Sequence, residues 1–202
     1  MSEPQDSPEH HTPEITATHR YPIEYADGPH PTLMPPDQLL KQCELRTQRR
    51  SGPGGQHRNK TSSGVFLTHQ PTGVLAEATE RRSQADNRGV ALQRLRMKLA
   101  VEIRTPSILD GPVSDPEQAF RQTRINGSMR GKATRLADTN PDKAPFLALL
   151  LNDLHAFGGQ PRQLTEPWQR SGTAIVRLIK SHPPAFKLLQ AIRQHHGLRP
   201  LS

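Results

Sequence analysis

The segment SGPGGQ at residues 51–56 has the composition of a loop that could take part in a reaction through its main chain. Its three glycines in four positions allow positive φ angles and a close approach to another molecule. Successive N–H groups in such a loop form a concave donor surface that suits an anion or a developing oxyanion. No Ser/His/Asp triad and no cluster of metal-ligating residue types lies near it in the sequence. A catalytic role would therefore depend on backbone N–H donors and a positioned water molecule.

Four basic residues flank this segment and are suited to holding phosphates: Arg49, Arg50, Arg58 and Lys60. The tripeptide GGQ occurs a second time at residues 158–160, where it follows an apolar run and has no Lys or Arg just before it. Glycine directly after the last residue of a periodic apolar pattern is an ordinary helix stop signal. We therefore interpret the second copy as the end of a helix, and we assign chemistry to Gly54, Gly55 and Gln56 alone.

The sequence around the 51–56 loop predicts the elements that must position it. Residues 43–47 alternate in polarity as a half-buried strand does. Residues 65–69 and 74–79 are joined by QPTG and predict a β-hairpin. Residues 83–86 have the spacing of a helix N-cap, and leucines three and four residues apart extend this helix to about residue 104. The expected fold class is α+β: a small antiparallel sheet packed by one long helix, with a protruding GGQ loop and a C-terminal helical region.

Charge and composition divide the chain into four segments. Residues 1–36 contain eight of the 20 prolines and are expected to form a disordered tail. Residues 37–104 are the expected GGQ catalytic domain, residues 105–120 an acidic linker, and residues 121–202 a basic segment with a small helical bundle. The net charge is +8, and two basic segments separated by an acidic one favour a polyanion, most simply nucleic acid, as the partner.

Composition also excludes several classes of protein. No apolar run approaches the ~20 residues that cross a bilayer, and the acidic start MSEPQDSPEH lacks the features of a signal or transit peptide. The single cysteine, Cys43, excludes an intramolecular disulfide and any zinc site built on several cysteines. We therefore expect a cytoplasmic monomer that needs no metal or other cofactor and has no membrane partner.

Residues 49–88 resemble the catalytic domain of class I peptide chain release factors, and most closely that of codon-independent ribosome-rescue peptidyl-tRNA hydrolases. The matching segments are SGPGGQ at 51–56, NKT at 59–61, LTH at 67–69, PTG at 71–73, RSQ at 82–84 and NR at 87–88. The resemblance implies that the loop enters the peptidyl-transferase centre and promotes hydrolysis of the P-site peptidyl-tRNA ester. Gln56 would donate its backbone N–H to the oxyanion, help to admit water, and be a candidate for N5-methylation. Arg58 departs from the small apolar residue usual in the family.

The partners that the resemblance implies are the large-subunit rRNA, the peptidyl-tRNA and, for the basic segment, the mRNA channel of the small subunit. The candidate ribosome-binding residues are Arg49, Arg50, Arg58, Lys60, Arg82, Arg88, Arg121, Arg124, Arg130, Lys132 and Arg135. We expect codon-independent release of stalled nascent chains, because the sequence has no β-rich region comparable to the codon-reading domain of release factors. One alternative is a non-catalytic ribosome- or RNA-binding protein of the same family. Another is a DNA-binding regulator that uses residues 173–180 as a recognition helix.

Overall fold

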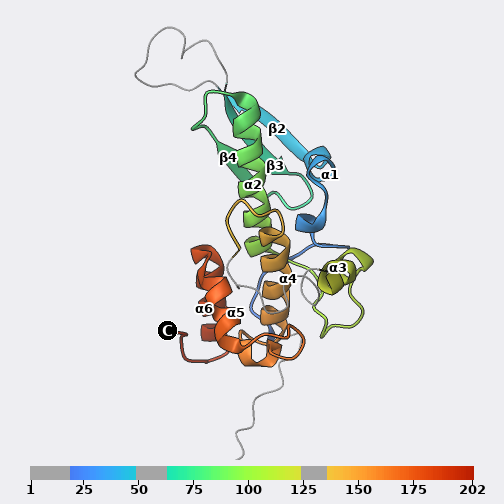
Figure 1. Cartoon of the computed structure of the whole chain (residues 1–202), viewed down its shortest axis with the longest axis vertical. Helices are drawn as coiled ribbons and strands as arrows, with labels where there is room; N and C mark the ends of the chain where they lie inside the picture. The colour runs from blue at the N-terminus through green and yellow to red at the C-terminus, as the bar shows by residue number, and fades with distance from the viewer. Residues whose placement is uncertain (1–18, 49–62, 124–135) are drawn as a thin grey trace, which may run out of the picture.

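The computed structural model describes residues 19–48, 63–123 and 136–202. A small sheet with a long helix forms one half of the molecule, and a group of shorter helices forms the other (Figure 1). The long helix, α2, runs along the long axis from the sheet toward the helical half (Figure 1). The predicted α+β class is confirmed. Among the described residues, none of the helices combines the length and apolar character that a bilayer crossing requires.

The sheet consists of β2 (Cys43–Gln48), β3 (Gly64–His69) and β4 (Leu75–Ala78) in the order β2-β3-β4, and both pairs are antiparallel. The predicted hairpin is therefore confirmed. Its turn closes through the N–H of Gly73, which has a φ of 68° and donates to the His69 carbonyl at 2.8 Å. The half-burial expected of β2 is wrong: Leu45 is 40% exposed. Helix α2 covers β3 and β4, so β2 remains an open edge.

Helix α2 (Gln84–Glu102) begins where its sequence predicts. The Ser83 hydroxyl accepts a hydrogen bond from the N–H of Asp86 at 3.2 Å, so one orphan donor of the first turn is satisfied. Leu95 and Leu99 are fully buried and pack against the sheet together with Val65. This packing fixes the sheet against the helix at whose start lie the matching segments at residues 82–84 and 87–88.

The helical half contains α4 (Lys143–Ala156), α5 (Gly172–Lys180) and α6 (Pro183–His195), with a short 3-10 turn at Pro161–Leu164. Every residue of α4 is buried, because this helix lies against α2, α6 and the residues that precede the sheet. The predicted C-terminal helical region is thus present, and α4 forms the centre of its core.

The second GGQ copy ends α4, as predicted. Gly158 and Gly159 adopt φ values of 59° and 75°, and the Gly159 N–H donates to the Leu154 carbonyl at 2.7 Å. A Cβ on Gly159 would lie 2.7 Å from Cγ of Arg193, whose guanidinium donates to the Gly159 carbonyl at 2.7 Å. These glycines serve a tight turn packed under α6.

Arg104 connects α2 to α4 from a fully buried position just after the end of α2. Its guanidinium donates to the carbonyls of Ala100 and Val101 at 2.6 and 2.8 Å, and to Oδ1 of Asn152 on α4 at 3.3 Å. Burial lowers its pKa to about 9. The carbonyls that end a helix carry partial negative charge and thereby offset the cost of burying this cation.

The expectation of a disordered tail through residue 36 requires correction for residues 19–36; residues 1–18 lie outside the described part of the chain. β1 (Glu24–Tyr25) pairs in parallel with β5 (Ile103–Arg104), and a 3-10 turn follows at Pro31–Leu33. His30 is fully buried, its Nε2 lies 3.2 Å from the Ile103 carbonyl oxygen, and burial lowers its pKa to about 3. Backbone pairing and a buried neutral histidine hold this segment, despite its many prolines.

Residues 105–120 also differ from the acidic linker expected for them. They include α3 (Asp115–Phe120) and three buried polar residues, Thr105, Ser107 and Glu117. The Glu117 carboxylate accepts from the Thr105 hydroxyl at 2.7 Å and from the His30 N–H at 3.2 Å. The acidic character of this stretch thus serves internal hydrogen bonds, and the segment packs against the rest of the molecule.

Candidate functional site

The described structure shows the base of the loop that carries the first GGQ. Gly54, Gly55 and Gln56 lie outside the described residues, as do their basic neighbours Arg49, Arg50, Arg58 and Lys60. The two ends of the loop are fixed next to each other, because Gln48 at the end of β2 pairs with Gly64 at the start of β3. The sheet therefore holds the described residues that flank the 49–62 segment side by side at one end.

Gly64 allows a close approach of backbone at this base. A Cβ at this position would lie 3.1 Å from the Gln48 carbonyl oxygen and 3.2 Å from Cγ2 of Thr79. Both distances are shorter than ordinary van der Waals contacts. Glycine is thus suited to the point where the loop returns to the sheet.

Asn87, on the first turns of α2, ties three segments together at the base of the loop. Its Oδ1 accepts from the Arg81 N–H at 2.9 Å, and its Nδ2 donates to the carbonyls of Arg81 and Ser63 at 2.9 and 2.5 Å. The side chain is fully buried, so these bonds replace water completely. Ser63 directly follows the undescribed loop segment. Asn87 is therefore a positioning residue. It belongs to the NR segment that resembles the family, but the sequence alone did not predict a role for it in the site.

Two of the candidate RNA-binding residues lie beside this base. Arg82, in the turn before α2, and Arg88, directly after Asn87, are both exposed. Nearby, Arg94 pairs with Glu80 at 2.6 Å and donates to the Glu77 carbonyl at 2.8 Å. The backbone N–H groups of Glu80 and Thr79, together with Arg94, keep the pKa of the Glu80 carboxyl below its usual range. The guanidinium of Arg94 is thus bound to other groups of the protein, whereas Arg82 and Arg88 are exposed to solvent.

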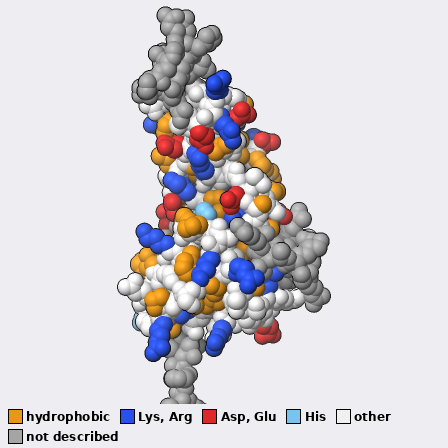
Figure 2. All heavy atoms as spheres, turned by 60° about the vertical axis from the view of Figure 1, so that its left-hand side comes forward, with side chains coloured by type: hydrophobic (Ala, Val, Ile, Leu, Met, Phe, Trp, Pro, Cys, Tyr) orange, Lys and Arg blue, Asp and Glu red, His pale blue; other side chains and the backbone are white. Residues whose placement is uncertain are grey.

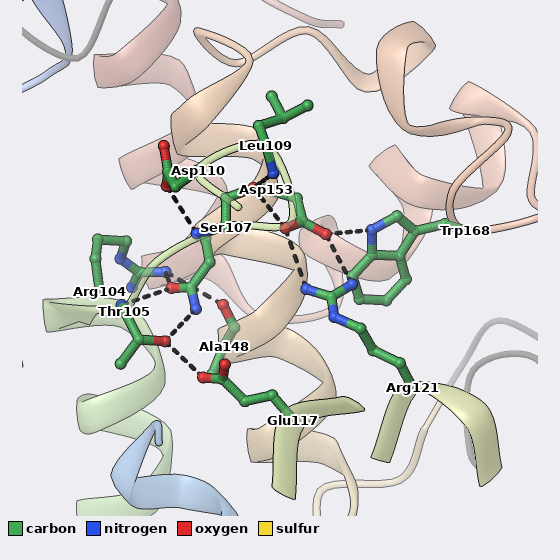
Figure 3. Close-up of polar contacts among 11 residues, drawn as sticks. Arg104, Thr105, Ser107, Leu109, Asp110, Glu117, Arg121, Ala148, Asp153 and Trp168 are labelled. Atoms are coloured by element: carbon green, nitrogen blue, oxygen red, sulfur yellow. Dashed lines mark hydrogen bonds and ion pairs between the residues drawn. The ribbon is translucent and has the colours of Figure 1, made fainter. Parts of the chain in front are cut away.

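Arg121 requires a correction, because the structure places it inside the helical half (Figure 3). Its two terminal nitrogens contact the two carboxylate oxygens of the buried Asp153 at 2.9 and 3.1 Å. The guanidinium also lies 5.3 Å from the ring centroid of Trp168. Because these contacts occupy its charge, Arg121 is unsuited to hold a phosphate. The other candidates of this segment lie outside the described residues: Arg124, Arg130, Lys132 and Arg135.

We expect the substitution Asn87→Ala to lower the free energy of unfolding by about 1–3 kcal/mol, because it leaves buried backbone groups of Ser63 and Arg81 without partners. Urea unfolding followed by circular dichroism measures the change. Gln84→Ala, at an exposed position on the same turn of α2, is the matched control and should leave the midpoint unchanged. Equal midpoints for the two variants would contradict the role given to Asn87.

The described residues contain no group of three or more His, Cys, Asp or Glu side chains placed to hold a metal ion. The arrangement that the structure provides is a rigid base with two exposed arginines beside it.

Comparison with known proteins identifies the family of this fold. The model of the RF-1 domain family matches residues 39–142, which include the sheet, α2 and the GGQ loop. Because this match covers half of the chain, the chain belongs to the RF-1 domain family, the class I release factor family that its motifs predict.

Individual relatives match over a shorter region. Peptide chain release factor 1 of Ureaplasma parvum serovar 3 is 51% identical over 65 residues, which cover 31% of this chain and 18% of the relative. Peptide chain release factor 2 of Acidovorax sp. (strain JS42) is 58% identical over 53 residues, 26% of this chain and 14% of the relative. Peptide chain release factor 1-like, mitochondrial, of Rattus norvegicus is 46% identical over 59 residues, 29% of this chain and 16% of the relative. The chain thus spans less than a fifth of the length of these relatives.

Proposed function

We propose that this protein hydrolyses the ester bond of peptidyl-tRNA on the ribosome and releases stalled nascent chains without reading a codon. One observation carries the proposal: the RF-1 domain match contains the segment SGPGGQ and the sheet and helix that anchor it. Relatives that share this region are named peptide chain release factors. Residues 37–104 are the proposed catalytic domain.

The proposed reaction is the attack of one water molecule on the ester carbonyl. Water adds to the carbonyl carbon, the bond to the 3′ oxygen of the tRNA breaks, and that oxygen takes up a proton as the peptide leaves as an acid. Gly54 and Gly55 shape the main chain, and the N–H of Gln56 donates to the oxyanion that develops. The Gln56 side chain admits water and excludes larger nucleophiles. Arg82 and Arg88, together with the four basic residues that flank the loop, bind phosphates of the large-subunit rRNA.

Codon independence enters the proposal through the resemblance of residues 49–88 to ribosome-rescue peptidyl-tRNA hydrolases, and the architecture outside the family match is mainly helical. The described residues there form helices and 3-10 turns, apart from the two-residue strand β1. In the proposal, the basic residues between 124 and 135 contact the empty mRNA channel of the small subunit.

A release assay with the full chain tests the proposal. Ribosomes that carry a labelled peptidyl-tRNA in the P site are prepared with a stop codon, with a sense codon, or with no mRNA beyond the P site. We expect the label to be released from all three complexes, with the third released at least as fast as the first. Release that requires a stop codon would contradict codon independence, and no release from any complex would contradict the proposed hydrolysis.

The second candidate function is a non-catalytic ribosome-binding protein of the same family. Arg58 favours it, because a long cation stands where the resemblance leads us to expect a small apolar residue. In the release assay this candidate would bind the arrested ribosomes and leave the peptide attached. Binding measured by co-sedimentation alongside release distinguishes the two functions.

A further inference from the structure

The surface of α5 and α6 carries an excess of positive charge that the proposed reaction does not use. The last 36 residues of the chain contain six Lys or Arg and no Asp or Glu. In the view of Figure 2, mainly basic side chains are spread over the lower part of the molecule, where α5 and α6 lie. Basic and acidic side chains are mixed on the upper part. Positive charge with no acidic residue among it is therefore a feature of the α5–α6 segment.

Three exposed residues of the two helices make up what we call the α5–α6 basic face: Arg177 and Lys180 on α5, and Lys187 on α6, next in sequence to Phe186. Arg177 and Lys180 are three residues apart on α5, so they lie on the same side of this helix. The opposite side of α5 buries Ile175, Leu178 and Ile179 in the core. Nζ of Lys180 lies 5.2 Å from the ring centroid of Phe186, which brings the charge of α5 next to α6.

The charged groups of this face have no acidic partner in the part of the chain that the structure describes. No carboxylate among the described residues forms an ion pair with Arg177, Lys180 or Lys187. By contrast, Arg121 on the same half is paired with Asp153. Cations on neighbouring helices repel each other, and an anionic partner would remove this repulsion.

The composition of the face favours a phosphate backbone over a protein surface. Protein interfaces are built around large apolar or aromatic side chains, which supply most of the binding energy. The exposed large apolar side chains of the described chain are Tyr25, Leu45, Leu75 and Leu109, none of which lies on α5 or α6. The same absence disfavours single-stranded nucleic acid, whose bases stack on exposed aromatic rings. A double helix presents phosphates without requiring such rings.

We propose that the α5–α6 basic face binds the phosphate backbone of double-helical RNA. Contacts of this kind are independent of sequence and depend strongly on salt. The phosphate contacts are argued from the face alone, whereas the choice of RNA over DNA rests on the proposed function at the ribosome. The face would give the protein a second attachment to RNA, on the helical half of the molecule rather than on the half that contains the sheet.

Fluorescence anisotropy with the full chain and a labelled RNA duplex of about 16 base pairs tests this proposal. The salt dependence of the dissociation constant is measured for the parent and for the triple variant Arg177→Gln, Lys180→Gln, Lys187→Gln. Because each lost phosphate contact lowers the salt slope by about one, we expect the triple variant to lose about two to three units of slope. We also expect its affinity at about 0.1 M salt to fall by roughly tenfold or more.

Two control variants test whether a loss of RNA binding comes from the position of the charges, and not from a lower net charge or from a disturbed fold. Lys41→Gln, Arg46→Gln, Lys98→Gln removes the same charge from exposed positions on the other half and should leave the slope unchanged. Arg177→Lys, Lys180→Arg, Lys187→Arg keeps the charge of the face and should bind as the parent does. Should the triple Gln variant fail to fold, Lys187→Gln alone is used and should lose about one unit of slope.

Three outcomes would overturn the inference: an unchanged slope in the triple Gln variant, an equal loss in the control on the other half, or tighter binding to a DNA duplex of the same sequence. The assay contains no ribosome and no ester. Its failure would therefore leave the proposed hydrolysis standing, and failure of the release assay would leave the phosphate contacts standing.

Discussion

Gly55→Ala should slow peptide release by about 10²–10³-fold, the usual effect of losing one oxyanion donor, and Gln56→Ala should slow it as well, while both variants retain ribosome binding. A Cβ at residue 55 restricts the backbone conformations open to the loop and so misplaces the N–H of Gln56. Removing the Gln56 side chain keeps this N–H but removes the group that admits water. Single-turnover release from arrested ribosomes measures the rate, and co-sedimentation measures binding.

The second GGQ copy provides the matched control for this prediction. Gln160→Ala makes the same side-chain change in the same tripeptide, but on the turn that ends α4, and release should stay at the parent rate. Gly159 is unsuitable as a control, because a Cβ there would lie 2.7 Å from Cγ of Arg193 at a φ of 75°. Full release activity from the Gly55→Ala protein would show that the loop does not act as proposed.

The sheet and α2 could be predicted from sequence because their signals are local. The hairpin is encoded by two β-rich runs with a Pro-Thr-Gly turn between them, and α2 by a Ser83 cap followed by leucines at helical spacing. Each signal lies within about one element length, so no knowledge of distant contacts is needed. The exposure of β2 is different, since it depends on how far α2 reaches across the sheet.

The packed segments at residues 19–36 and 105–120 were missed because their partners are distant in sequence. His30 contacts Ile103, and Nε2 of His155 lies 2.7 Å from the carbonyl oxygen of Tyr21. Proline-rich and acidic compositions favour disorder only when no other segment supplies hydrogen-bond partners. Here α4 and the residues after α2 supply them, and neither composition nor periodicity indicates such a pairing.

The candidate site, too, contains residues that local sequence patterns indicate and residues whose role depends on distant contacts. The roles of the GGQ residues and of their basic neighbours stay predictions, made from residue types, short spacing and the resemblance of residues 49–88 to the family. The role of Asn87 depends on two carbonyls from different segments, those of Ser63 and Arg81. An asparagine near a helix start has no pattern of its own that would indicate this role. Arg121 illustrates the opposite error, because an arginine in a basic run resembles an RNA contact until its buried partner is known.

Asp153→Ala should lower the free energy of unfolding by about 3–5 kcal/mol, the usual cost of leaving a buried charge unpaired. The Asp153 carboxylate is fully buried and accepts from the Ser107 hydroxyl at 2.8 Å and the Trp168 indole N–H at 2.7 Å. It also accepts both bonds from Arg121. Figure 3 shows how these three donors, from separate segments, converge on one side chain. The substitution leaves all of them without their acceptor.

Urea unfolding followed by tryptophan fluorescence measures this loss directly, because Trp168 is the single tryptophan of the chain and touches the site. Asp153→Asn keeps the volume and one acceptor oxygen, so we expect a smaller loss than for alanine. The double variant Asp153→Ala, Arg121→Met removes both charges, and its loss should be less than the sum of the single losses. Strict additivity would contradict the pairing.

The same set of variants separates the two kinds of arginine on the helical half. Because Arg121 is ion-paired with the buried Asp153, Arg121→Met should lower the unfolding midpoint and leave the salt dependence of RNA binding unchanged. Arg177→Gln should do the reverse, since its side chain is exposed and the substitution breaks no ion pair among the described residues. A basic segment of the sequence thus contains arginines with two different roles. A change in the unfolding midpoint identifies an arginine that stabilises the fold, and a change in the salt dependence of RNA binding identifies one that contacts phosphates.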